Sequence, residues 1–177
     1  IIRGELTPDN LIRLAIQDNL TPEPGGIYQH DLSMHTWMGL AGAPLHGYDT
    51  SREAFLGTYR GYHDPRAVEE GRCTNSCVYG DNACGSLQTD LVLQPGESRE
   101  LLVLLGIGDA RTVGRETFAE FGSLERAETE LQKLKDHWHA RLGGLTVHTP
   151  DPELDHTLNV WGLYNCLITF AWSRAAS

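Results

Sequence analysis

Three cysteines with close spacing are the first residues in this sequence whose type suggests chemistry. Cys73, Cys77 and Cys84 follow the pattern C-x3-C-x6-C. Thiolates bind zinc, but zinc sites usually pair their ligands in tighter knuckles or add two histidines at helical spacing. No histidine lies between Cys73 and Cys84, and the nearest one upstream is His63. We therefore favour reduced thiols, with a zinc-stabilised module as the weaker alternative; a disulfide among the three stays open.

The other reactive side chains do not form a catalytic pattern. Eight histidines are scattered along the chain, without an H-E-x-x-H motif or a Ser/His/Asp arrangement. The glycine-rich stretches 80–85 and 106–108 lack the strand, G-x-G-x-x-G and helix order of a phosphate-binding loop. The adjacent Glu69 and Glu70 are more typical of a solvated loop than of a glycosidase acid and base. From the residues alone we predict no catalytic residue and no metal ligand.

The charge balance of the chain excludes two classes of partner. Its 177 residues include 24 Asp and Glu against 14 Lys and Arg, a formal net charge of −10. Nucleic acids and anionic membranes require a basic surface that displaces counterions, so we expect neither as a partner. Hydrophobic residues make up 40% of the chain and charged residues 21%, which is a globular composition.

The ends and the apolar stretches of the chain bear on location. The longest apolar stretch, around 101–107, is far too short to cross a bilayer. No signal peptide opens the chain, so we expect a cytoplasmic protein. The sequence begins with Ile1 and Ile2 rather than Met, and it ends on 174–177 without a stop signal. We interpret it as a piece of a longer protein.

The first two-thirds of the chain is predicted to be β-structure. Strands are expected, in chain order, over 10–19, 27–43, 73–79, 86–93 and 99–107. The long polar and aromatic segment 47–71 is expected to be a loop. Because no helical pattern separates these strands, an antiparallel sandwich is favoured over a parallel sheet.

A first helix is predicted after this β-region. Ser123 can cap it, and apolar residues then recur every three or four positions up to Leu142. Gly143 and Gly144 are expected to end it in the left-handed conformation. A short strand over 145–148 should follow.

A second helix is predicted from the prolines of 149–153 to the end of the chain. Proline suits the first helical turn, where the backbone N–H groups lack partners. From Leu154 to Trp172 the apolar residues cover nearly every side of this helix. Such a helix is expected to be enclosed by other helices, which this sequence does not contain.

Four segments of the chain form a combined pattern in a fixed order. They are 43–61 (APLHGYDTSREAFLGTYRG), 93–106 (LQPGESRE and the apolar strand after it), 147–166 (VHTPDPELD and then NVWGLYNC) and 169–177 (TFAWSRAAS). In order and spacing they resemble the inverting glycoside phosphorylases of glycoside hydrolase family 94, which include cellobiose, cellodextrin and chitobiose phosphorylases. The resemblance covers most of the chain from about Gly26 onward. The three clustered cysteines are not part of the family pattern.

The resemblance implies a mixed fold, β first and then α. An antiparallel β-sandwich, part of a supersandwich, would be followed by a linker helix and the first helix of an (α/α)6 barrel. The implied domains are residues 1–112 for part of the N-terminal sandwich, 113–150 for the helical linker and 151–177 for the start of the catalytic barrel.

The resemblance also implies an activity for the parent enzyme. It would cleave a β-linked gluco-disaccharide or oligosaccharide with inorganic phosphate, giving an α-sugar 1-phosphate. One carboxylic acid would protonate the departing oxygen while phosphate attacks the opposite face of the sugar, as water does in an inverting glycosidase. Phosphate is a co-substrate, no other cofactor is implied, and a homodimer is expected. The family's catalytic aspartate would lie beyond Ser177, so the chain alone is expected to be inactive and to associate through its apolar helix.

Two residues near the C-terminal end are predicted to lie beside the substrate. Ser173 and Arg174 would follow the first barrel helix, as partners of the substrate loop or of phosphate. The alternative is that Arg174 pairs with a carboxylate at the helix end, where cations are favoured.

A second functional class remains open, a non-catalytic carbohydrate-binding or structural sandwich. Its sugar contacts would be made by aromatic residues of the 47–71 segment, namely Tyr48, Phe55, Tyr59 and Tyr62. The competing interpretation is that these rings pack the long loop, because aromatic side chains dominate packing in general.

Overall fold

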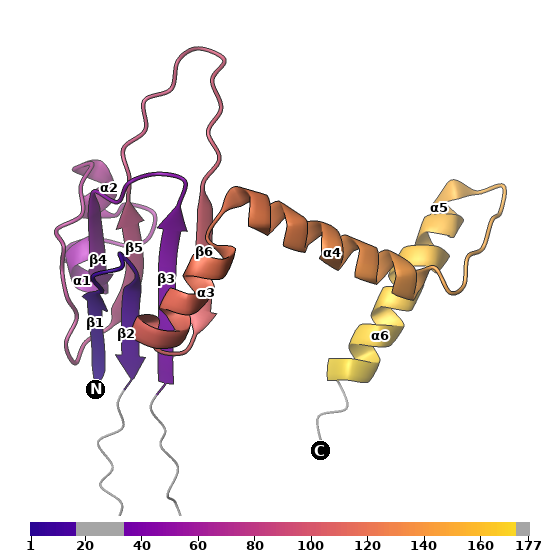
Figure 1. The fold of residues 1–177 in the computed structure, drawn as a ribbon, viewed down its shortest axis with the longest axis horizontal. Coiled ribbons are helices and arrows are strands. Elements are labelled where there is room, and N and C mark those ends of the chain that lie inside the picture. Colours follow the sequence, from indigo (N-terminus) through magenta and orange to yellow (C-terminus); the bar gives the residue numbers. More distant parts are fainter. Residues whose placement is uncertain (17–33, 173–177) are drawn as a thin grey trace, which may run out of the picture. The chain divides into compact units, whose positions relative to one another are not determined.

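The computed structural model describes residues 1–16 and 34–172 (Figure 1). The chain divides into two compact units, Ile1–Ala127 and Glu128–Ser177. All of the described strands lie in the first unit, and the regular structure described in the second unit is helical.

Two antiparallel sheets build the first unit. Within the residues that the structure describes, one sheet has four strands in the order β1-β2-β3-β6, and the other pairs β4 with β5. The strands are β1 (Ile2–Leu6), β2 (Ile12–Ile16), β3 (Met34–Ala41), β4 (Gly47–Ser51), β5 (Ala83–Gln88) and β6 (Leu102–Ile107). The two sheets face each other: a Cβ atom added to Gly4 of β1 would lie 2.6 Å from Thr50 of β4, and one added to Gly85 of β5 would lie 3.1 Å from Met38 of β3. This arrangement is an antiparallel sandwich of two layers.

A small apolar core fills the other face of the four-stranded sheet. Leu11 and Ala110 are fully buried and Trp37 nearly so, with Leu104 and Phe118 packed against them. Phe118 belongs to α3 (Arg115–Phe121), which follows the π-helical turn η1 (Ala110–Gly114). Glycine at position 39 of β3 gives this helix room, because a Cβ atom there would lie 2.6 Å from both Leu11 and Phe118.

A cluster of charged side chains ties the same sheet face to η1. Arg13 of β2 binds the Asp109 carboxylate through Nε at 2.8 Å and through its terminal nitrogen at 2.7 Å. His35 Nδ1 lies 2.9 Å from the same oxygen, and Arg111 reaches Glu5 of β1 at 2.8 Å. The Arg13 hydrogen bond is the main cause that lowers the pKa of Asp109 from 3.8 to about 2.

The described residues from Ser123 onward are mainly helical. α4 (Leu124–Leu142) begins where the Ser123 hydroxyl accepts the N–H of Arg126. Helix α5 (Pro152–His156), the π-helical turn η2 (Thr157–Gly162) and α6 (Leu163–Trp172) then follow without a break. Asp151 caps α5 by accepting the N–H groups of Glu153 and Leu154. None of the described helices could cross a bilayer.

The predicted order of strands first and helices afterwards is confirmed, and so is the helix that starts after Ser123. The predicted 47–71 loop is wrong, because it contains β4, α1 (Arg52–Leu56) and α2 (Arg66–Glu69). The β4 strand shows no apolar alternation, since its buried side chains include the polar Asp49 and Thr50.

The other predicted strands were too long or absent. β5 ends at Gln88 instead of continuing over 86–93, and β6 begins at Leu102 instead of 99. Segment 73–79 makes only single pairings, Ser76 with β4 and Tyr79 with β1. The parts of the predicted strands within 17–33 lie outside the described residues.

The segment after α4 also differs from the prediction. Residues 145–148 form no strand, because the Val147 N–H and C=O both bind the Asn159 side chain at 2.7 Å. α4 does end before Gly143, but neither Gly143 nor Gly144 has a positive φ. The Gly143 N–H instead binds the His139 carbonyl at 2.8 Å, which continues the helical pattern for one more bond.

The Asp109 cluster predicts a pH-dependent stability. A carboxyl whose folded pKa lies below its unfolded value stabilises the fold above the unfolded pKa and loses that contribution as pH falls through the folded pKa. The chain and its Asp109→Asn variant should therefore differ in the free energy of unfolding. This difference should be constant above pH 3.8 and should vanish as the pH falls toward about 2. Urea unfolding across this range measures it, with the exposed Asp9→Asn as control. A gap that does not change with pH would contradict the assignment.

Candidate functional site

The candidate site is built on a buried carboxylate, Asp49 of β4, which is 0% exposed. It accepts hydrogen bonds from four groups. The backbone N–H and the hydroxyl of Thr74 donate at 3.1 and 2.7 Å, and those of Ser76 donate at 3.0 and 2.7 Å. Burial raises the pKa of this carboxyl, but the hydrogen bonds from Ser76 and Thr74 together outweigh it and hold the pKa below 3.8. Asp49 is therefore a structural anion that fixes the segment after Cys73 against β4.

The neighbouring Thr50 extends this connection to the other sheet. Its hydroxyl donates to the Ser76 carbonyl at 3.1 Å and accepts the Val78 N–H at 2.8 Å. The Val78 carbonyl in turn accepts the Gly4 N–H of β1 at 2.9 Å. Residues 76–80 thus lie between β4 and β1 and close that side of the sandwich.

The strand leads directly into helix α1 and a strained turn. Ser51 caps α1 by accepting the Ala54 N–H at 3.3 Å. Gly57 ends the helix with φ of 85°, a left-handed conformation that glycine adopts without strain. Tyr59 also has a positive φ, 63°, which costs free energy for a side chain of this size. Non-glycine residues with a positive φ are often found at functional sites.

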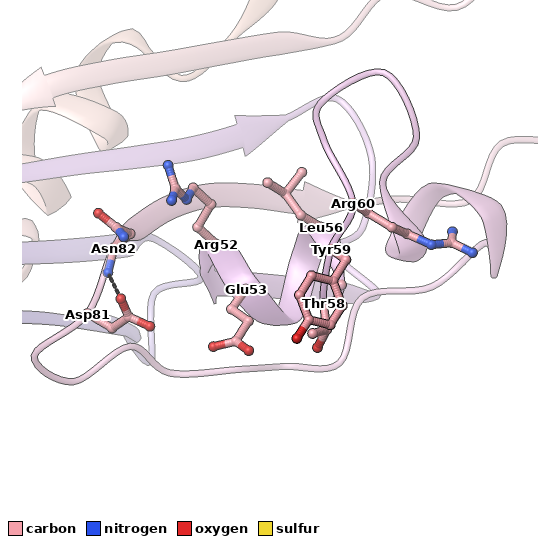
Figure 2. A pocket seen from close by; sticks show the side chains of 9 residues that line it. Arg52, Glu53, Leu56, Thr58, Tyr59, Arg60, Asp81 and Asn82 are labelled. Carbon is pink, nitrogen blue, oxygen red and sulfur yellow. Dashed lines mark hydrogen bonds between the residues drawn. The ribbon is translucent and has the colours of Figure 1, made fainter.

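A polar hollow of about 330 Å³ lies between this turn and the start of β5 (Figure 2). Its lining residues are Arg52, Glu53, Leu56, Gly57, Thr58, Tyr59, Arg60, Asp81 and Asn82. In Figure 2, Glu53 and Tyr59 point to one side of α1 and Arg52 points to the other. Arg60 is held by Glu69 of α2 and lies 3.7 Å from Asp64. The hollow combines carboxylates, an amide, guanidinium groups and a phenol, a set that suits a polar, hydroxyl-rich ligand.

The four aromatic residues predicted as sugar contacts fall into two groups. Tyr48 and Phe55 are partly buried. The hydrogen bond between the Tyr48 hydroxyl and Cys77 raises the pKa of Tyr48 to about 12. Tyr59 and Tyr62 are 103% and 72% exposed, so they do not pack the segment. The packing interpretation holds for the first pair and fails for the second.

The clustered cysteines are free thiols. Burial is the main cause that raises the pKa of Cys73 and that raises the pKa of Cys84 to about 11, so both thiols stay protonated at neutral pH. Within residues 1–16 and 34–172, no three His, Cys, Asp or Glu side chains are grouped closely enough to hold a metal ion. The predicted site residues Ser173 and Arg174 lie outside the described residues.

A second hollow, also about 330 Å³, lies within the helical unit and is apolar. Trp138, Leu142, Val160, Trp161 and Tyr164 line it. None of these five lining residues is a carboxylate or a cation.

Comparison with known protein families decides the relationship of the chain. The sequence profile described as "Glycosyl hydrolase 94, supersandwich domain" matches residues 3–124, more than half of the chain. The chain belongs to glycoside hydrolase family 94. The profile of the family's catalytic domain matches residues 137–177, so this family 94 chain combines parts of two domains.

Several curated relatives carry phosphorylase names. The chain is similar to the N,N'-diacetylchitobiose phosphorylases of Vibrio furnissii and Vibrio proteolyticus, with 36% identity over 158 residues and 38% over 130. These matches cover 86% and 73% of the chain but 20% and 16% of the relatives. Solabiose phosphorylase of Paenibacillus borealis is 30% identical over 80% of the chain and 19% of its own length. The family 94 chain thus spans about a fifth of the length of these relatives.

The sequence reasoning found the family segment 43–61 but not the roles of residues within it. Asp49 and Thr50 were part of the recognised pattern, yet their partners Thr74 and Ser76 lie 25 and 27 positions away from Asp49. The available signal was a pair of polar residues within the motif, followed by a Thr-Asn-Ser run that can donate hydrogen bonds. The hollow could not be predicted from the sequence, because its lining comes from α1 and from Asp81 and Asn82, and neither segment alone carries a recognisable pattern.

Replacement of Asp49 tests this site's foundation. In Asp49→Asn the amide keeps one acceptor oxygen, but its NH2 group faces donors, so buried donors lose their partner. We expect a loss of about 1–3 kcal/mol in the free energy of unfolding, measured by urea denaturation. Asp64→Asn is the matched control, since this exposed carboxylate meets Arg60 only at 3.7 Å and surface ion pairs contribute little. Equal effects of the two substitutions would refute the anchoring role of Asp49.

Proposed function

We propose that the chain is part of an inverting glycoside phosphorylase. The complete enzyme cleaves a β-linked gluco-disaccharide or oligosaccharide with inorganic phosphate and releases an α-sugar 1-phosphate. The observation that carries this proposal is the match of one chain to both family 94 profiles, in order, together with relatives named as phosphorylases. The names of the two Vibrio relatives favour N,N'-diacetylchitobiose as the first substrate to assay.

The proposed division of labour follows the domain boundaries expected from the sequence. Residues 1–112 are part of the sandwich, 113–150 form the helical linker, and 151–177 begin a catalytic (α/α)6 barrel. The exposed apolar side chains of the last helices support this assignment, because Leu158, Trp161 and Phe170 are 42%, 53% and 63% exposed. Helices that are apolar on several sides require neighbours that cover them.

In the proposed reaction the chain's described residues supply scaffold and contacts rather than proton transfer. A carboxylic acid protonates the departing glycosidic oxygen, and phosphate attacks the opposite face of the anomeric carbon. Since phosphate is already an anion, it requires no base. We assign neither the acid nor the phosphate-binding cations to a described residue.

A second candidate function is supported by the hollow beside α1. Tyr59 is fully exposed on a strained turn and lines the same hollow as Glu53 and Asp81. An exposed ring beside polar groups can stack on one face of a sugar while those groups bind its hydroxyls. This would make the sandwich a carbohydrate-binding module, with or without the catalytic role.

A phosphorolysis assay tests the first proposal. The complete gene product, mixed with N,N'-diacetylchitobiose or cellobiose and inorganic phosphate, should release sugar 1-phosphate with inverted configuration, detected by ¹H NMR. Residues 1–177 alone should release none, because the chemistry requires a proton donor for the leaving oxygen. Failure of the complete product on every β-linked disaccharide, or release by residues 1–177, would contradict the proposal.

Substitution of Tyr59 tests the second proposal separately. Tyr59→Ala should weaken the binding of N,N'-diacetylchitobiose to the chain by about tenfold, the equivalent of about 1.4 kcal/mol, as measured by isothermal titration calorimetry. Tyr79→Ala is the matched control, because that exposed ring lies over Arg3 at 5.1 Å instead of lining the hollow. No binding by the unchanged chain, or an equal effect of both substitutions, would reject a sugar site here.

A further inference from the structure

The polar hollow beside α1 carries its carboxylates on one side. Figure 2 shows Asp81 and Glu53 on the same side of α1 as Tyr59, whereas the Arg52 guanidinium points to the opposite side. All four of these residues line the hollow. A ligand that lies against Tyr59 therefore faces two carboxylates and an aromatic ring.

Neither carboxylate is neutralised by a cation in the part of the chain that the structure describes. The Asp81 carboxylate accepts the Asn82 N–H at 2.6 Å, and Glu53 forms no ion pair. Arg60, the other guanidinium of the hollow, is already bound by Glu69 of α2. Both carboxylates belong to exposed residues, so their charge is available to a ligand.

This combination of groups recognises an organic ammonium ion. An ammonium group is attracted to the face of an aromatic ring, and it donates strong hydrogen bonds to carboxylates. Tyr59 is fully exposed, so its ring is open to such a ligand. The Thr58 hydroxyl and the Asn82 amide line the same hollow and can bind sugar hydroxyls. A sugar that carries a protonated amine uses both sets of groups.

We infer that the hollow binds an amino sugar with a free, protonated amine in preference to a neutral or N-acetylated sugar. The ammonium group binds at Glu53 and Asp81, and the sugar ring stacks on Tyr59. This inference rests on the second proposed function, the sugar site of the sandwich, and it names the ligand class of that site. It is independent of phosphorolysis.

An acidic sugar fits the hollow less well. Its carboxylate would face Glu53 and Asp81, and like charges at short distance repel each other. Arg52 points to the other side of α1, and Arg60 is occupied by an acidic partner. The net charge of −10 on the chain acts in the same direction, because it attracts cations and repels anions.

Hydroxyl-radical footprinting tests the inference on the complete gene product. Mass spectrometry measures the oxidation of Tyr59 relative to that of Tyr79, an exposed ring outside the hollow, so that radical scavenging by the sugars cancels. The β-1,4-linked glucosamine disaccharide is compared with N,N'-diacetylchitobiose, which differs from it only in the acetyl groups. Phosphate is left out, and the experiment is run at about pH 6, where the free amine is protonated. The glucosamine disaccharide should protect Tyr59 at about tenfold lower concentration.

Replacement of the two carboxylates should remove this preference. In the double variant Glu53→Gln/Asp81→Asn, the two sugars should protect Tyr59 at concentrations within about twofold of each other, because only the attraction of the ring for the amine remains. Glu116→Gln is the matched control, since this exposed carboxylate of α3 lies outside the hollow. The control variant should keep the tenfold preference.

The possible failures of this experiment are distinguishable. Equal protection by the two sugars in the unchanged protein, or a full preference in the double variant, would overturn the ligand class and leave the sugar site in place. No protection of Tyr59 by either sugar would overturn the sugar site and the inference with it. Stronger protection by a disaccharide that carries a carboxylate would also overturn the inference, because the guanidinium groups would then determine the ligand.

Discussion

A single buried carboxylate sets the geometry of the first unit. Asp49 has no solvent contact, and it receives hydrogen bonds from two residues that lie 25 and 27 positions further along the chain. A buried charge without partners is costly, so the segment that supplies the donors must adopt one conformation. That segment then reaches β1 through Val78 and joins the two sheets. The start of α1, and with it one wall of the polar hollow, follows directly after the same strand.

The sequence predicted those elements whose signals are local. The helix after Ser123 and the proline-rich start of α5 were identified from caps and apolar spacing, and the structure has both. β4 was missed because its buried side chains are polar and their partners are distant in sequence. The family was recognised from segments of the chain, but the hollow was not, since it is formed by two segments joined only in the fold. The features that could not be predicted from the sequence are therefore those that depend on hydrogen bonds between distant residues.

Exposed apolar surface connects the fold to the proposed enzyme. Val103, Leu105 and Ile107 of β6 are exposed to solvent, and so are Trp161 and Phe170 in the second unit. Burial of one large apolar side chain stabilises a fold by about 1.5–3 kcal/mol, so these surfaces favour further contacts. The chain spans about a fifth of its relatives' length, and both matched profiles are domains of one family. The sandwich and the helices are best understood as parts of one larger protein.

The anchoring role of Asp49 is the central claim, and amide hydrogen exchange tests it most directly. In the folded chain the Thr74 and Ser76 N–H groups both point at the Asp49 carboxylate, at 3.1 and 3.0 Å. The account predicts that these two amides exchange as slowly as those of the β1–β2 pairing, and that they lose protection together in Asp49→Asn. Exchange of either amide at the rate of an unfolded peptide in the unchanged chain would contradict it.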